Sequence, residues 1–308
     1  MRNPLTVPGF KVALSLIAVA ILAGCASVNL EQTLEKANAQ TGNFTAGQLN
    51  LSQTDQQRDE RLQAASKLLT SVVGQKEAVQ LALLNSPAMQ AMLAQSWADS
   101  SLAAQSGRIA NPVFSFERVR AGEELEFGRI LTFGLLDLIT LPYRKGIADQ
   151  RIAQSQIRLA AEVVDRTTQV RQSWVRAVAA KQSLAYAKQV YENAEAGAEL
   201  ARRLEAVGNF NKLARARQQT FYADAATRLS AAHQQEISAR EDLIRLLGLD
   251  DKQAAQLRLP DRLPELPKQA RQPAEVAKAA SNGRLDIQLA QSALNVSAKA
   301  QGLETINS

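Results

Sequence analysis

The longest uninterrupted pattern in the chain lies between Pro142 and Pro260, where no proline occurs. Residues 145–206 are mainly Ala, Gln, Arg, Glu, Leu and Lys, which are strong helix formers, and residues 212–247 continue this composition. A helix of roughly 60 residues would be roughly 90 Å long, at about 1.5 Å per residue. Because helices of compact domains average about 11–12 residues, the pattern predicts a mainly α protein built around two long helices.

The two predicted helices are separated by a short break at residues 207–211. Gly208 and Asn209 readily adopt the left-handed backbone angles that end helices, and the side chain of Asn211 can cap the helix that follows. The sequence therefore predicts a long antiparallel helical hairpin with its turn at Gly208.

Within the first long helix, seam positions recur at alternating steps of four and three residues, which indicates a coiled-coil-like seam. The positions are Ala187, Tyr191, Ala194, Ala198 and Ala201, preceded by Val170, Trp174 and Ala177. Most are alanine, and small side chains let helices approach closely. This favours a sheath of many helices over a two-stranded coiled coil, although a long helix in an ordinary α-bundle is the alternative.

A two-residue period replaces the helical period just before these helices. Residues 113–119 have β-type composition, residues 121–124 form a polar turn, and residues 127–141 alternate between two faces. They predict a β-hairpin over 113–141 that Pro142 ends. Because a lone hairpin is marginal in water, its strands must pair with others, either in a small buried sheet or in a membrane β-barrel.

The flanking regions are less regular. Residues 77–107 have helical spacing with a break at Asn85-Ser86-Pro87, because the residue before a proline avoids helical angles. Residues 25–75 are polar and weakly periodic, so we expect a tether with one helix at 55–69. Residues 257–273 contain four prolines and predict an extended connector.

The first residues predict export. Arg2 and Lys11 precede a short apolar run over 12–22 and a small-residue cleavage site, which is the layout of a signal peptide over residues 1–24. The segment Leu22-Ala23-Gly24-Cys25 resembles the bacterial lipobox, whose cysteine is lipidated. Ala26 stands where an aspartate is associated with inner-membrane retention, so the resemblance implies a lipid anchor in the outer membrane. The alternative is an ordinary signal that ends near a cysteine.

The residue inventory argues against an enzyme. Cys25 is the only cysteine, and its lipidation would leave no thiol for catalysis. His233 is the only histidine and lies in a polar helical stretch, and no Gly-rich phosphate loop occurs. We therefore expect no catalytic site, no metal site and no cofactor. The net charge of +6 is scattered, and with the export signal it does not favour a nucleic-acid partner.

A short internal repeat follows the connector. Leu93-Ala94-Gln95-Ser96 recurs as Leu289-Ala290-Gln291-Ser292, an offset of 196 residues (289 − 93). We therefore expect a first repeat over 76–256, and a connector with the start of a second repeat over 257–308.

Three segments resemble the repeat of the TolC-like outer-membrane channel family. EAVQLALLNSP at 77–87 is similar to its opening motif, LARRLEAVGNFNKL at 200–213 to its helical-hairpin tip, and AREDLIRLLGL at 239–249 to the end of its first repeat. The resemblance covers roughly residues 77 to 308.

The resemblance implies a homotrimeric channel with two repeats in each protomer. Each repeat gives two strands to a shared barrel in outer-membrane lipid and one helical hairpin to a periplasmic tunnel. The channel is a passive export duct for small molecules or ions, and an adaptor protein couples it to an inner-membrane pump. The implied barrel strands lie near 113–119 and 127–141. The implied adaptor-binding tip consists of Arg203, Leu204, Val207, Gly208, Asn209 and Phe210.

The sequence departs from this family pattern at Ser308, one helix into the second repeat. An incomplete second repeat would lack half the barrel strands, and an open sheet edge in lipid leaves backbone groups unsatisfied. We therefore expect the chain not to conduct unless another chain supplies the remainder.

Two other functions fit part of the sequence. A periplasmic adaptor lipoprotein is also exported and has a long helical hairpin, but it needs Gly- and Val-rich strands of a lipoyl-like domain beside that hairpin. A structural coiled-coil lipoprotein explains the helices and the anchor but neither the β-hairpin nor the repeat. The cargo leaves no mark in the sequence.

Overall fold

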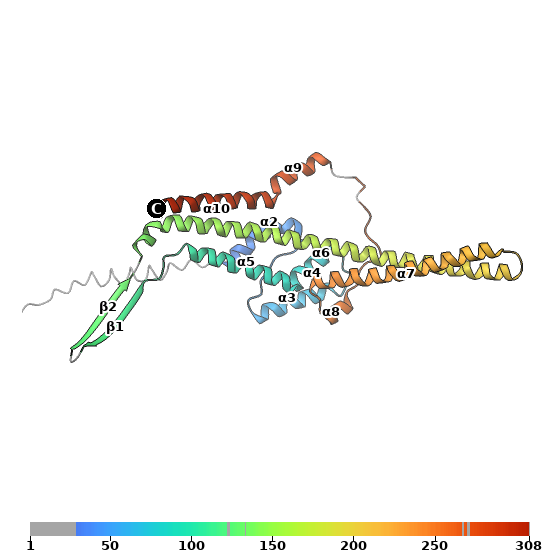
Figure 1. Ribbon diagram of the computed structural model, residues 1–308, viewed down its shortest axis with the longest axis horizontal. Helices are drawn as coiled ribbons and strands as arrows, with labels where there is room; N and C mark the ends of the chain where they lie inside the picture. The colour runs from blue at the N-terminus through green and yellow to red at the C-terminus, as the bar shows by residue number, and fades with distance from the viewer. Residues whose placement is uncertain (1–28, 122–123, 133, 267, 270–271, 308) are drawn as a thin grey trace, which may run out of the picture. The chain divides into compact units, whose positions relative to one another are not determined.

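The computed structural model describes residues 29–121, 124–132, 134–266, 268–269 and 272–307 (Figure 1). Its elements in order are α2 (Leu30–Thr45), α3 (Asp55–Leu68), α4 (Gln75–Asn85), α5 (Pro87–Ser106), β1 (Val113–Ala121), β2 (Glu124–Thr132), α6 (Leu135–Ala206), α7 (Lys212–Leu247), α8 (Asp251–Gln256), α9 (Pro273–Gly283) and α10 (Leu285–Asn307). The expected signal peptide and Cys25 lie outside the described residues. None of the described helices combines the length and the apolar character needed to cross a membrane.

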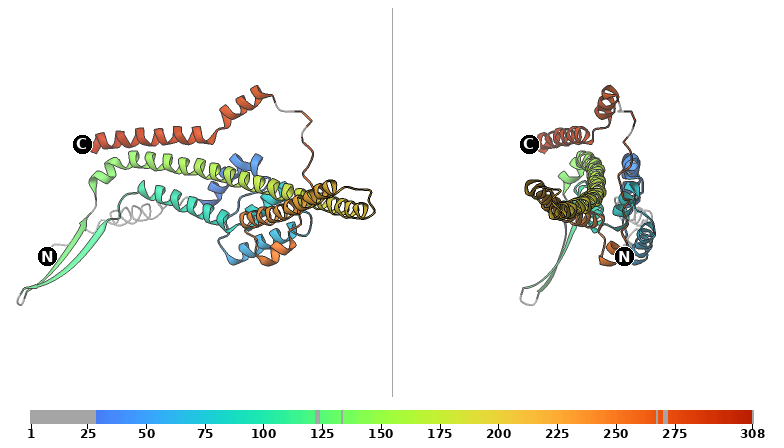
Figure 2. Two further views of the ribbon diagram at one scale, coloured as in Figure 1. Left: turned by 45° about the vertical axis from the view of Figure 1, so that its right-hand side comes forward. Right: turned by 90° about the vertical axis from the view of Figure 1, so that its right-hand side faces the viewer.

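The predicted helical hairpin is confirmed. α6 has 72 residues and α7 has 36, and the two helices lie side by side and antiparallel (Figures 1 and 2). The alanine seam faces inward, because Ala194 and Ala201 of α6 and Ala225 of α7 are each only 2% exposed. The two helices also come close together at Gly197 of α6, because a Cβ on this residue would lie 3.4 Å from Gln218 Oε1 on α7.

The main apolar core lies around α4, in the unit formed by residues 34–96 and 156–289. Helix α4 is buried on most sides because it packs against α3 and α7. Trp174 of α6 is 3% exposed, and its indole N–H donates a hydrogen bond of 2.9 Å to the carbonyl oxygen of Val73. The core residues include Val79, Leu81, Met89, Leu93, Leu159, Val163, Val170, Val178, Leu243 and Leu247.

The expected tether over residues 25–75, with one helix at 55–69, contains two helices in its described part. The expected helix near 55–69 is present as α3, but α2 precedes it, and both contribute buried side chains to the main core. Asn38 of α2 exchanges two hydrogen bonds with the backbone of Leu49, which folds the segment back on itself. Residues 30–45 are polar and only weakly periodic in sequence, and their burial depends on these contacts.

The connector is extended as predicted, and it is held on the helices by side chains. Lys181 of α6 donates to the carbonyl oxygen of Leu259 at 2.8 Å and forms an ion pair of 2.9 Å with Asp261. Arg240 of α7 donates to the carbonyl oxygens of Ala254 and Leu257, both at 3.0 Å. Helices α9 and α10 follow the connector and repeat the order of a short helix and a longer one seen in α4 and α5.

The second unit includes the β-hairpin. Strands β1 and β2 pair antiparallel, with Val113 opposite Thr132 and Arg120 opposite Leu125. The two strands form a sheet of their own in the described part of the chain. The prediction that this sheet joins a membrane barrel stays a prediction.

The predicted second strand over 127–141 is wrong beyond Thr132, because α6 already begins at Leu135. A short apolar run fits a strand and a helix equally well by period alone. Arg144 stabilises the first turns of α6. Its Nη1 donates a hydrogen bond of 2.8 Å to Asp137 Oδ1, which lies two turns earlier on the same face of the helix. Pro142 therefore lies inside α6, although it was expected to end a strand.

Candidate functional site

The turn between α6 and α7 is closed by main-chain hydrogen bonds. Gly208 donates to the carbonyl oxygen of Glu205 and Asn209 donates to that of Leu204, both at 2.9 Å, which is the Schellman pattern of a helix end. Gly208 has φ +79°, and a Cβ on it would meet nothing within 4 Å. Within this chain, the backbone angle explains the glycine, and crowding by a neighbouring helix does not.

The start of α7 is capped as predicted. The Oδ1 atom of Asn211 accepts a hydrogen bond of 2.8 Å from the backbone N–H of Ala214. This bond satisfies one of the backbone donors that the first turn of a helix leaves without an intrahelical partner. The tip therefore has a defined backbone on both sides of the turn.

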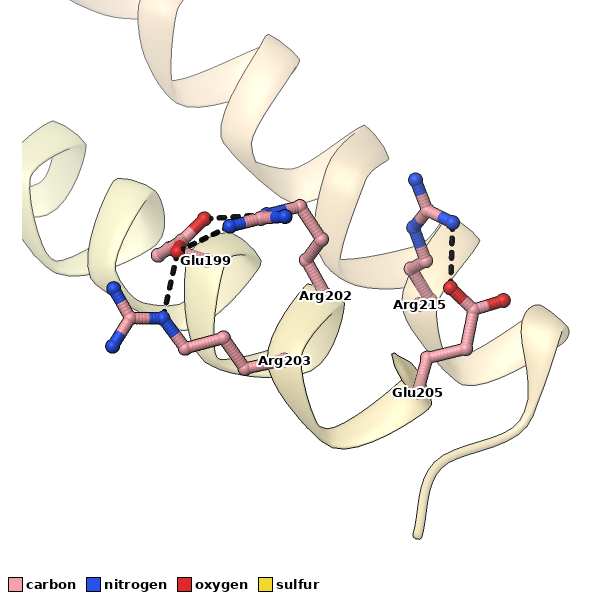
Figure 3. Close-up of polar contacts among 5 residues, drawn as sticks. All are labelled: Glu199, Arg202, Arg203, Glu205 and Arg215. Atoms are coloured by element: carbon pink, nitrogen blue, oxygen red, sulfur yellow. Dashed lines mark hydrogen bonds and ion pairs between the residues drawn. The ribbon is translucent and has the colours of Figure 1, made fainter. Parts of the chain in front are cut away.

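Two arginines share one carboxylate beside the turn (Figure 3). Arg202 donates from Nε and Nη2 to the two oxygens of Glu199, both at 2.8 Å, and Arg203 donates from Nε to Oε1 at 2.7 Å. The hydrogen bonds from Arg202 and then Arg203 lower the pKa of Glu199 to about 2. Glu199 is therefore ionised at neutral and mildly acidic pH, and the group of three keeps one net positive charge.

A second ion pair joins the two helices across the turn (Figure 3). Arg215 of α7 donates from Nη1 to Glu205 Oε2 of α6 at 2.5 Å. This pair limits how far the last turn of α6 can separate from the first turn of α7. Both acidic residues near the turn are thus already bound to arginine.

The six tip residues predicted from the sequence all lie at this end of the hairpin. Val207 is 69% exposed, Arg203, Gly208 and Asn209 are also exposed, and Leu204 and Phe210 are partly buried. Sequence reasoning did not include the exposed Leu213, nor the acidic residues that bind the arginines. The spacing of Glu199 three and four residues before two arginines is a signal that would have identified that group.

A pair of tyrosines joins the helices farther from the turn. The hydroxyl groups of Tyr191 on α6 and Tyr222 on α7 lie 2.9 Å apart, and their ring centroids are 5.4 Å apart. The hydrogen bond with Tyr222, followed by burial and the charge of Glu195, raises the pKa of Tyr191 to about 12. The hairpin therefore has polar links between its helices at the tyrosines and at the tip.

The β-hairpin has two chemically different faces. Residues directly opposite each other in an antiparallel pair point to the same side, so the register assigns each side chain to a face. One face carries Phe114, Phe116, Arg118, Arg120, Leu125, Phe127, Arg129 and Leu131, and the other carries Val113, Ser115, Glu117, Val119, Glu126, Gly128, Ile130 and Thr132. We call them the aromatic face and the acidic face. The rings of Phe116 and Phe127 are 5.9 Å apart on the aromatic face.

In the part of the chain that the structure describes, the His, Cys, Asp and Glu side chains form no group that could hold a metal ion. His233 is an exposed residue of α7.

Comparisons with known proteins give a result only at the level of structure. Neither a protein-family model nor a curated protein sequence matches the chain. The crystal structure of a membrane protein from Pseudomonas aeruginosa matches with a TM-score of 0.55 and 20% identity, over 74% of this chain and 57% of that one. The Campylobacter jejuni CmeC outer membrane channel matches with a TM-score of 0.53 and 16% identity, over 83% of this chain and 56% of that one.

These matches concern the fold. The chain spans little more than half the length of either solved protein. Its long helical hairpin and two-stranded antiparallel sheet are the elements that the sequence predicted for a TolC-like repeat. Over the matched part, the chain has the fold of the CmeC outer membrane channel.

Proposed function

We propose that the chain is a subunit of an outer-membrane channel in a tripartite efflux system, and that the channel is a passive export duct for small molecules or ions. The observation that carries this proposal is the combination of a 72-residue helix, folded back on α7, with a β-hairpin whose apolar side chains are exposed. A small protein that stays in water buries such strands, whereas a membrane channel needs them exposed.

In this proposal, the β-hairpin and the turn of the helical hairpin face different surroundings. The β-hairpin lies in outer-membrane lipid as part of a barrel completed by other strands, and Cys25 carries the lipid anchor. The turn of the helical hairpin lies in the periplasm and binds an adaptor protein, which couples the channel to an inner-membrane pump. Three copies assemble around the duct. The adaptor contacts are Arg203, Leu204, Val207, Gly208, Asn209 and Phe210.

Cell fractionation of the full chain tests this assignment. After expression in a Gram-negative host, the membranes are separated by density, and trypsin is added to intact or to permeabilised cells. We expect the chain in the outer-membrane fraction, with cleavage at Arg202 and Arg203 only after permeabilisation. Sedimentation with the inner membrane would instead favour the adaptor alternative.

A second variant distinguishes a channel subunit from a structural coiled-coil lipoprotein. An ordinary cleavable secretory signal replaces residues 1–25, so that the exported chain has no lipid. The exposed apolar strands should keep this variant in the outer membrane through a wash at alkaline pH. Release of the variant into the soluble periplasmic fraction would contradict the proposal.

A further inference from the structure

The tip of the helical hairpin carries an excess of positive charge. Residues 199–217 contain five basic and two acidic residues, which leaves three of the chain's six net positive charges in this segment. The adjoining part of α6, residues 181–198, contains two basic and two acidic residues and is neutral. This neutral stretch separates the excess at the tip from the basic residues Arg166, Arg171 and Arg176 farther along α6.

The geometry of the tip leaves these positive charges available to a partner. Its two carboxylates, Glu199 and Glu205, are bound by Arg202, Arg203 and Arg215. Lys212 and Arg217 at the start of α7 are exposed, and neither forms an ion pair among the residues that the structure describes. A partner that approaches the tip therefore meets basic groups that are not paired with an acidic group in the described part of this chain.

Apolar side chains lie among these cations. Val207 in the turn is 69% exposed and Leu213 on the first turn of α7 is 62% exposed. Protein interfaces commonly combine an apolar centre with a charged rim, and complementary charge on the rim sets specificity and the rate of association. The tip has this composition, because its exposed apolar side chains lie among groups whose net charge is positive.

We infer that the tip selects an acidic partner: the end of a helical hairpin whose carboxylates outnumber its basic groups and whose apolar side chains pack on Val207 and Leu213. This inference rests on the proposed function, in which the partner is the periplasmic adaptor. The complex is steered by charge, so its affinity falls as salt screens the tip, over a Debye length of about 10 Å at 0.1 M.

Binding to defined peptides tests the inference. The probes are two synthetic helical hairpins with the same length and the same apolar residues, one with only Glu and the other with only Lys as the charged residues of its turn. Each is titrated against the full chain in detergent, and binding is followed by fluorescence anisotropy at low and at high salt. The Glu hairpin should bind about tenfold more tightly than the Lys hairpin, and the preference should shrink at high salt.

Three variants separate the tip from the total charge. Lys212→Gln with Arg217→Gln removes two unpaired charges of the tip and should weaken binding of the Glu hairpin about tenfold. Arg228→Gln with Arg245→Gln removes the same charge elsewhere on α7 and should leave it unchanged. Glu199→Gln adds one net positive charge to the tip and should strengthen it.

Several results would overturn the inference: binding of neither peptide, equal binding of both, equal losses in the two arginine-containing double variants, or weaker binding of Glu199→Gln. The assay does not require the chain to conduct or to reach a membrane. A chain that prefers the Glu hairpin but is absent from the outer-membrane fraction would contradict the proposed function and support the charge preference. A chain found in the outer membrane that shows no such preference would support the proposed function and contradict the inference.

Discussion

Gly248 packs against Pro87 so closely that a Cβ on Gly248 would come within 2.6 Å of Pro87 Cδ. The same Cβ would lie 2.8 Å from the Cα of Ser86, which is backbone and cannot move aside by a rotamer change. Asn85 completes this contact, because its Nδ2 donates to the carbonyl oxygen of Gly248 at 2.7 Å. The end of α7 is thereby fixed to the junction of α4 and α5.

Replacing Gly248 with alanine should destabilise the chain much more than replacing Gly208 with alanine. Both glycines have positive φ, +68° and +79°, which costs an alanine about 1–2 kcal/mol. Only Gly248 adds a clash, and overpacking costs about 1–3 kcal/mol more. Urea unfolding of the full chain in detergent, followed by circular dichroism, measures both variants. Equal losses would show that the contact with Pro87 carries no strain.

The tyrosine pair predicts a specific alkaline instability. The ordinary pKa of tyrosine is about 10, and that of Tyr191 in the folded chain is raised to about 12. The stabilisation from this proton is therefore fully present below pH 10 and is lost as the pH rises through 12. The Tyr191→Phe variant, which has no such proton, should lose less stability between pH 9 and 12.

The matched control for this experiment is Tyr186→Phe, because Tyr186 lies on the same helix and is exposed. Urea unfolding midpoints at several pH values are compared among the native chain and the two variants. The native chain and Tyr186→Phe should decline together. If the stability of Tyr191→Phe fell as steeply with pH as that of the native chain and of Tyr186→Phe, the hydrogen bond with Tyr222 would not be the cause of the alkaline instability.

The two faces of the β-hairpin should differ in their tolerance of charge. Phe127 on the aromatic face and Ile130 on the acidic face are exposed to similar degrees, 53% and 55%. If the aromatic face meets lipid, Phe127→Lys should cost about 2–4 kcal/mol of insertion and lower the yield in the outer membrane, whereas Ile130→Lys should not. In that orientation, the arginines on the aromatic face would reach polar groups by extending their long side chains toward the membrane surface. Greater sensitivity at Ile130 would reverse the assignment of faces.

The lipid anchor predicts that cells grown with labelled palmitate incorporate the label into the chain. The Cys25→Ser variant should lose the label completely, because Cys25 is the only cysteine. Ser27→Ala changes a neighbouring residue that takes no part in the modification and should keep the label. Gel fluorography of the immunoprecipitated chain measures both variants. Retained label in Cys25→Ser would show that lipid is attached elsewhere.

Features that depend on local chemistry could be predicted from the sequence. The turn at Gly208 and the cap at Asn211 are each determined by a few neighbouring residues. The two long helices beyond residue 145 followed from the absence of proline, whereas the start of α6 at Leu135 did not. The inward-facing seam followed from the spacing of small residues. The tip residues were implied by the resemblance of residues 200–213 to the hairpin tip of the TolC-like family, and their binding role stays a prediction.

Features that depend on distant contacts were missed. The ion pair between Glu205 and Arg215 joins two helices across the turn, so no spacing along one helix reveals it. Helix α2 gains its burial from contacts with the core and from the bonds between Asn38 and Leu49. The helical start of α6 was read as a strand because its leucine-rich run satisfies both periods, and the bond between Arg144 and Asp137 is formed only once the helix exists.

The most direct test of the channel proposal is the mass of the protein extracted by detergent from isolated outer membranes, measured by size-exclusion chromatography with light scattering. The account predicts a stable particle with at least the protein mass of three chains, because further strands complete the barrel. A particle with the mass of one chain, or the absence of the chain from outer membranes, would contradict it.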